Sequence, residues 1–214
     1  MADQNHSSEN SKAKAPRQRR APKGEMRRTA LLDAATDVIA RNGYWAASMR
    51  EVADMAGITS VGLLHHFPNK TALLHALLER RDQRMSEHFG DLQADLTLDG
   101  LFDFIKMNMR FSIQSLRDCQ AYVMINVESL AQDHPAWAWQ QEKFTEVHGH
   151  AQAHLAALCE RNEIRPDVDL KALMTEIFAV MDGLQIQWLR SPDEVDVEAT
   201  LDAYLQRVAA TIRP

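Results

Sequence analysis

Two short helices joined by a tight turn are predicted between residues 48 and 66, and this segment constrains the fold most. Ser48 and Glu51 have the spacing of a capping box, so a helix begins just after Ser48. Gly57 follows where the turn needs a residue that tolerates positive φ, and Thr59 can cap the next helix. The small and apolar residues that would fix the crossing angle are Ala53, Ile58 and Leu63. The spacing fits a helix-turn-helix that enters a DNA groove, although a generic corner between two helices shares it.

Helix is expected along the rest of the chain as well. The 214 residues include only 8 Gly and 7 Pro, and no stretch alternates apolar and β-branched residues as a strand would. The fold class is therefore predicted to be all-α. A first helix should end at Gly43, and longer amphipathic helices are expected at about 98–117, 118–132, 135–162, 169–190 and 197–212.

The composition also limits where the protein acts. No apolar run approaches the roughly 18 residues of a membrane span, so no membrane contact is expected. The basic N-terminus lacks the apolar core of a secretory signal. Cys119 and Cys159 stand alone, which favours two buried, reduced thiols. Together these features indicate a cytoplasmic protein.

Charge is distributed unevenly along a chain whose net charge is −6. Residues 1–28 carry 8 basic and 3 acidic residues, whereas residues 81–214 carry 12 basic and 22 acidic residues. Residues 1–24 are polar and almost free of large apolar side chains, which predicts a disordered basic arm. A basic front and an acidic body indicate that only one end meets phosphate, although a solvated basic tail would look the same.

The run from Arg27 to Arg81 resembles the DNA-binding head of the tetracycline-repressor (TetR) family. The resemblance is carried by Asn42-Gly43-Tyr44, the Ser48 cap, Val52-Ala53, Gly57-Ile58-Thr59, Gly62-Leu63, His65-His66-Phe67 and Asn69-Lys70 in that order. It implies a three-helix helix-turn-helix domain at residues 25–70, followed by a helical ligand-binding and dimerisation domain at residues 71–214. The protein would then be a repressor that a small-molecule inducer releases from a palindromic operator.

The resemblance also implies which residues contact double-stranded operator DNA. They are Arg27, Arg28, Ser48, Arg50, Thr59, Ser60, Val61, Gly62, His65 and Lys70. Residues 59–62 would begin the helix that faces the groove, and Lys70 would contact a phosphate. Many family members have a tyrosine where this chain has Leu64, so that phosphate contact is lost. Phe67 is expected in the core, and His66 fits either a half-buried position or a DNA contact.

In the TetR family the last two helices form a four-helix bundle with the partner subunit. The helices at about 169–190 and 197–212 have broad apolar faces that suit such a homodimer, although a bundle within one chain would also use them. The residues proposed to line a ligand pocket are Phe104, Asn108, Phe111, Met124, Trp137, Phe144, His148 and Gln185. Any single aromatic residue or Met among them also fits an ordinary core position.

Three other interpretations follow from the residues. His150 and His154 lie one helical turn apart and could hold a metal, but Cys159 is out of register, so no metal and no cofactor are predicted. A helical enzyme is disfavoured because the chain has no nucleophile elbow, no phosphate-binding glycine loop and no HExxH motif. A helical sensor that does not bind DNA remains the second alternative.

Overall fold

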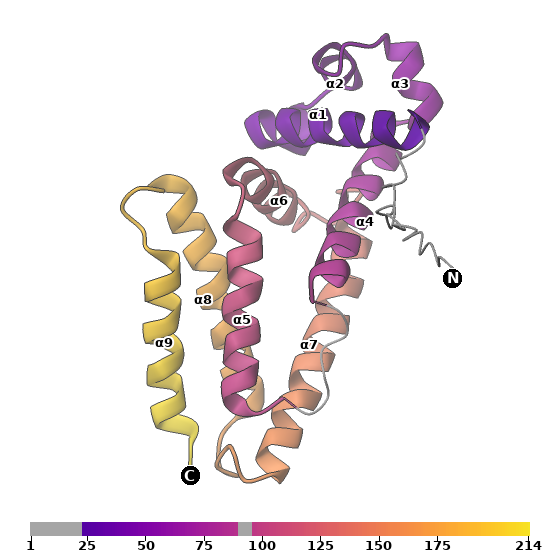
Figure 1. Ribbon diagram of the computed structural model, residues 1–214. Coiled ribbons are helices and arrows are strands. Elements are labelled where there is room, and N and C mark those ends of the chain that lie inside the picture. The colour runs from indigo at the N-terminus through magenta and orange to yellow at the C-terminus, as the bar shows by residue number, and fades with distance from the viewer. Residues whose placement is uncertain (1–22, 90–95) are drawn as a thin grey trace, which may run out of the picture.

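A computed structural model of the protein describes residues 23–89 and 96–214, and these residues form helices without any strand (Figure 1). The all-α prediction is confirmed. The helices are α1 (Lys23–Ala46), α2 (Met49–Met55), α3 (Ser60–His66), α4 (Lys70–Phe89), α5 (Leu98–Ile113), α6 (Leu116–Glu128), α7 (Trp137–Glu160), α8 (Leu170–Arg190) and α9 (Val197–Ile212). The predicted arm, apart from its last two residues in α1, lies outside the described residues.

The three helices at the N-terminal end form a head above the body (Figure 1). The Ser48 hydroxyl accepts a hydrogen bond from the Glu51 backbone N–H, and the Glu51 carboxylate accepts one from the Ser48 N–H, which confirms the capping box. Gly57 has a φ of 66°, as the turn requires. The Thr59 hydroxyl accepts from the N–H of Gly62 and starts α3. Local sequence signals therefore set the whole helix-turn-helix.

α1 extends past its predicted end, with a break at Gly43. This residue has a φ of 74° and a ψ of 170°, a conformation that is essentially restricted to glycine. Gly43 therefore does interrupt the first helix, and a short second piece continues to Ala46.

The body contains α4 to α9, and α6 runs directly beneath α1 (Figure 1). The boundary between α5 and α6 lies earlier than the predicted residue 117, because α5 ends at Ile113. The Ser115 hydroxyl accepts from the Asp118 N–H and starts α6 at Leu116. The N-cap serine was missed because the apolar pattern continues through it. No helix in the described part of the chain is long and apolar enough to span a membrane.

Apolar side chains gather in two separate cores. The first unites α1, α2 and α3 with the first half of α4 and with Ala121 and Ile125 of α6. The second lies among α5, α7, α8 and α9. The packing thus groups α6 with the head, although α6 lies far from the head in sequence.

Candidate DNA-binding face and ligand cavity

One side of α3 is exposed and the opposite side is buried. Leu63 belongs to the first core, whereas Val61 and Leu64 are 66% and 46% exposed. Thr59, Ser60 and His65 are exposed on the same side as these two residues. A helix that presents apolar and polar side chains together suits the major groove, where thymine methyl groups meet apolar contacts and base edges meet polar ones. Leu64 was set aside in the sequence because it cannot bond a phosphate, but its exposure places it on this face.

Gly62 lies within the first turn of α3 and is partly buried. A Cβ atom there would lie 3.3 Å from the Thr59 hydroxyl oxygen that caps the helix. A larger residue would therefore press on the cap as well as thicken the exposed face. Phe67 is only 2% exposed, so its predicted core position is confirmed, and His66 is half-buried.

Basic side chains flank this face. The Arg28 guanidinium lies 4.8 Å from the centre of the Phe67 ring, and the Arg27 side chain is exposed beside it in sequence. Arg50 on α2 is almost fully exposed, and its Nε is 3.7 Å from the Asp54 carboxylate. An exposed pair of this kind contributes little to stability, so Arg50 is available to a phosphate.

Lys70 begins α4 and has a structural partner already. Its Nζ donates to the carbonyl oxygen of Trp45 at 3.0 Å and lies 4.4 Å from the centre of the Tyr44 ring. Burial lowers the pKa of Lys70, while the Glu128 and Glu51 carboxylates act in the opposite direction. An ammonium has three N–H donors, so Lys70 can tie the end of α1 to α4 and still contact a phosphate.

Replacing Arg50 with Ala is expected to weaken DNA binding without changing base preference. Loss of one phosphate contact should reduce the slope of log K against log salt by about 1. The measurement is a titration of DNA affinity across salt concentrations. Arg165→Ala, which removes an exposed arginine from the segment between α7 and α8, is the matched control and should leave the slope unchanged. An unchanged slope in the Arg50 variant would remove Arg50 from the interface.

A cavity of about 80 Å³ lies beneath the head, between α1, α4, α5 and α6. Three arginines of α4 line it, namely Arg80, Arg81 and Arg84. Its other polar lining includes Asp118 and Gln114. Of the eight residues predicted to bind a ligand, Phe111 alone is part of this lining. The arginines were not singled out in the sequence, where basic residues on an exposed helix carry no such signal.

The other predicted pocket residues lie in several places. Phe104 packs edge-on against Phe89, and Phe111 contacts the same ring. The His148 ring stacks between Phe144 and Phe178, with ring centres 3.7 and 4.4 Å away. The remaining four are Asn108, Met124 and Trp137, which are partly buried, and Gln185, which is buried near the Cys119 thiol. The ligand assignments therefore stay predictions.

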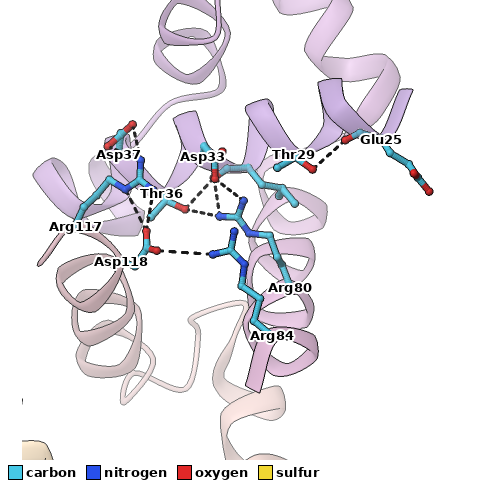
Figure 2. Close-up of polar contacts among 10 residues, drawn as sticks. Glu25, Thr29, Asp33, Thr36, Asp37, Arg80, Arg84, Arg117 and Asp118 are labelled. Atoms are coloured by element: carbon cyan, nitrogen blue, oxygen red, sulfur yellow. Dashed lines mark hydrogen bonds and ion pairs between the residues drawn. The ribbon is translucent and has the colours of Figure 1, made fainter. Parts of the chain in front are cut away.

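Ion pairs join the head to the body next to the cavity, as Figure 2 shows. The Arg80 guanidinium on α4 donates to the Asp33 carboxylate of α1 at 2.7 Å and to the Thr36 hydroxyl at 2.9 Å. Arg117 on α6 lies 3.4 Å from Asp37 of α1 and 3.1 Å from Asp118. The arginine side chains are partly buried, which strengthens their attraction to carboxylates relative to exposed pairs.

A second connection lies at the other end of α6. The Glu128 carboxylate accepts a hydrogen bond from the Tyr44 backbone N–H at 2.7 Å, immediately after the break at Gly43. His134 is 2% exposed and packs edge-on against the Tyr44 and Trp45 rings. Its Nδ1 accepts from the Ala136 N–H at 3.1 Å, so the neutral ring fits this site.

His134 should make stability depend on pH. Burial lowers its pKa from the ordinary 6.5, so below pH 6.5 the unfolded chain binds more protons than the folded chain. Stability is therefore expected to fall as the pH drops below about 6.5, until the folded-state pKa is reached. His134→Asn retains an acceptor for the Ala136 N–H but does not titrate. The melting temperature should fall less steeply between pH 8 and pH 5 for this variant than for the wild type. An equal pH dependence of the two melting temperatures would exclude His134 as the cause of the loss of stability.

The histidines considered as metal ligands do not converge. His150 is exposed, whereas His154 is 7% exposed on α7. Within residues 23–89 and 96–214, no three metal-binding side chains gather closely enough to hold an ion. Cys119 is buried, which raises its pKa to about 11, and Cys159 is half-buried; both are free thiols.

The three-helix head, its exposed α3 face and the helical body define a helix-turn-helix DNA-binding protein. The sequence profile of bacterial regulatory proteins of the tetR family matches residues 31–77, and that of the BetI-type transcriptional repressor C-terminal domain matches residues 107–212. This chain belongs to the TetR family. It is a DNA-binding transcription regulator that responds to a ligand.

Known relatives agree with this assignment. The repressor KstR2 of Rhodococcus jostii is 26% identical over 85% of this chain and 89% of its own length. The activator FasR of Mycolicibacterium smegmatis is 46% identical over 28% of this chain and 27% of its own length. The regulator FadR of Bacillus subtilis, solved with stearoyl-CoA, has the same fold, with a TM-score of 0.69 and 20% identity over 85% of this chain and 97% of that structure.

Proposed function

We propose that this protein is a homodimeric repressor that binds a palindromic operator and is released by a small-molecule inducer. Residues 25–70 would form the DNA-binding domain and residues 71–214 the domain for ligand binding and dimerisation. Repression would take place in the cytoplasm, where bacterial DNA lies. The observation that carries the proposal is the exposed face of α3, which presents apolar and polar side chains together and suits a major groove.

A two-fold dimer follows from the need to read two half-sites. We assign the dimer contact to α8 and α9, which are adjacent at one side of the body (Figure 1). Leu201 and Leu205 of α9 are buried within their own chain, so the broad apolar face of α9 does not by itself require a partner. Phe178 and Trp188 of α8 are only partly buried, and a second subunit would cover them further.

The coupling from ligand to DNA would run through α4 and α6. Both helices hold α1 directly, α4 through Arg80 and Asp33, and α6 through the Glu128 contact with Tyr44. A ligand that favours a different position of either helix would tilt the head and change the spacing of the two α3 helices. Such a ligand acts only through its different affinities for the two arrangements.

The test is a salt-titrated binding assay of the full-length protein with the intergenic DNA upstream of its own gene. Random DNA of equal length is the control. We expect tight, footprinted binding to a palindrome and weaker binding to random DNA at every salt concentration. Equal, weak binding to both would favour the sensor that does not bind DNA. A transcription assay with the footprinted site then separates a repressor from an activator.

A further inference from the structure

We infer that the cavity beneath the head binds an acidic group, a carboxylate or a phosphate, carried by the ligand of this regulator. This inference rests on the proposed function and names the chemical class of ligand. It starts from Arg80, Arg81 and Arg84, which converge on one cavity in a body that is otherwise acidic.

Arg81 is the most informative of the three side chains. It is half-buried, and its guanidinium carbon lies 3.0 Å from the centre of the Tyr122 ring. Within the described part of the chain, no carboxylate pairs with it and no oxygen accepts a hydrogen bond from it. Loss of solvent lowers the pKa of Arg81, yet a guanidinium keeps its charge. A desolvated cation without an ion pair is costly, so an anion that enters the cavity would be bound strongly.

The geometry leaves room for such an anion. The Arg81 guanidinium carbon lies over the Tyr122 ring, and the N–H donors of a guanidinium are suited to paired oxygens. Arg80 is already bonded to Asp33. Arg84 lies 3.7 Å from the Asp118 carboxylate, which also pairs with Arg117. One lining carboxylate therefore faces more than one guanidinium, and the cavity has an excess of positive charge.

The size of the cavity indicates what enters it. An apolar cavity of about 150 Å³ holds benzene, so the 80 Å³ here admits an acidic group with a few carbon atoms. Phe111, Leu77 and Ile125 line it beside the arginines and would contact those carbons. The rest of a larger ligand would extend beyond the cavity.

The site also lies where binding could be transmitted. An anion bound to Arg81 is positioned to compete with Asp118 for Arg84, which would weaken the contact between α4 and α6. Arg80, on the same turn of α4, holds Asp33 of α1 at 2.7 Å (Figure 2). The acidic group of the ligand would thus change the position of the helix that supports the head.

The test compares ligands that share one hydrocarbon chain and differ only in the head group. Octanoate, octyl phosphate, octanol and octylamine are titrated into the full-length protein by calorimetry, without DNA. We expect octanoate or octyl phosphate to bind at least about tenfold more tightly than octanol and octylamine, because only the anions bring a negative charge to the guanidinium donors. Whichever of octanoate and octyl phosphate binds more tightly shows whether the ligand carries a carboxylate or a phosphate.

Substitutions in the cavity test whether its arginines cause the preference for anionic probes. Arg81→Gln should remove the preference for anions, and Arg84→Gln should reduce it. The control Arg165→Gln removes one positive charge at an exposed position and should retain the preference. Thermal melting shows whether each variant is folded, and Arg84→Gln still tests the site if Arg81→Gln unfolds.

Three outcomes would overturn the inference: tighter binding of octylamine, equal binding of all four probes, or an unchanged anion preference in both cavity variants. The calorimetry needs no operator, so its result does not depend on DNA binding. If the palindrome is bound but no anion is preferred, the ligand class is wrong and the regulator proposal stands. If anions are preferred but no operator is bound, the ligand class stands and the operator proposal is wrong.

Discussion

A protein with Asp in place of Val61 is expected to lose about a hundredfold in operator affinity while its melting temperature stays unchanged. Val61 is 66% exposed, so the substitution leaves the core intact. A carboxylate in the first turn of α3 also suits the positive end of the helix. In the complex, however, the same carboxylate would lie close to the DNA phosphates, and such a contact between like charges costs several kcal/mol. The expected hundredfold loss of affinity corresponds to about 3 kcal/mol.

Val147→Asp is the matched control for this experiment. Val147 is 46% exposed on α7, a helix of the body and not of the head, so the same change of residue should leave operator affinity unaltered. Affinity is measured by fluorescence anisotropy at fixed salt, and folding by circular dichroism melts. Wild-type affinity in the Val61 variant would mean that α3 does not face the groove.

Replacing Gly43 with Ala is expected to lower stability by roughly 3 kcal/mol or more. The backbone conformation there costs a residue with a side chain about 1–3 kcal/mol. An added Cβ would also overlap Oε1 of Glu128 and push away the carboxylate, whose Oε2 accepts the hydrogen bond from the Tyr44 N–H. Loss of a hydrogen bond to a charged group costs about 1.5–3 kcal/mol more. For a chain of this length the melting temperature should fall by roughly 6–12 °C.

Gly57→Ala separates these two causes. Gly57 also has a positive φ of 66°, but no atom lies within 4 Å of an added Cβ. Backbone strain alone should cost this variant about 1 kcal/mol. Similar melting temperatures for the two variants would show that the Glu128 contact contributes no measurable stability.

The helix-turn-helix could be predicted in detail because its signals are local. The Ser48 cap, the positive φ of Gly57 and the Thr59 cap each depend on a few neighbouring residues, and the final helix was predicted with its observed bounds. The boundary near residue 115 was wrong because a capping serine interrupts a continuous apolar pattern.

The cavity and the two head–body connections could not be predicted from sequence. Arg81 and Tyr122 come from helices separated by an intervening helix, and Glu128 reaches a backbone N–H that lies 84 positions earlier. Such pairings depend on how helices pack, and a polar residue on an amphipathic helix normally faces solvent. The same limit applies to the proposed pocket residues, whose periodicity is equally consistent with a core.

The shared core of α1 to α4 and α6 has a consequence for how the protein opens. Because Ala121 and Ile125 complete the apolar cluster of the head, the part that meets DNA lacks a finished interior of its own. A fragment ending at residue 70 would expose Leu31, Leu63 and their neighbours to water. Amide hydrogen exchange should therefore show α6 protected together with α1 as one cooperative unit, while α8 and α9 exchange independently. The unit that unfolds together then includes α6, whereas the unit that binds DNA ends before it. A small movement of α6 is therefore passed to the DNA-binding helices through the shared core, and no hinge is needed between them.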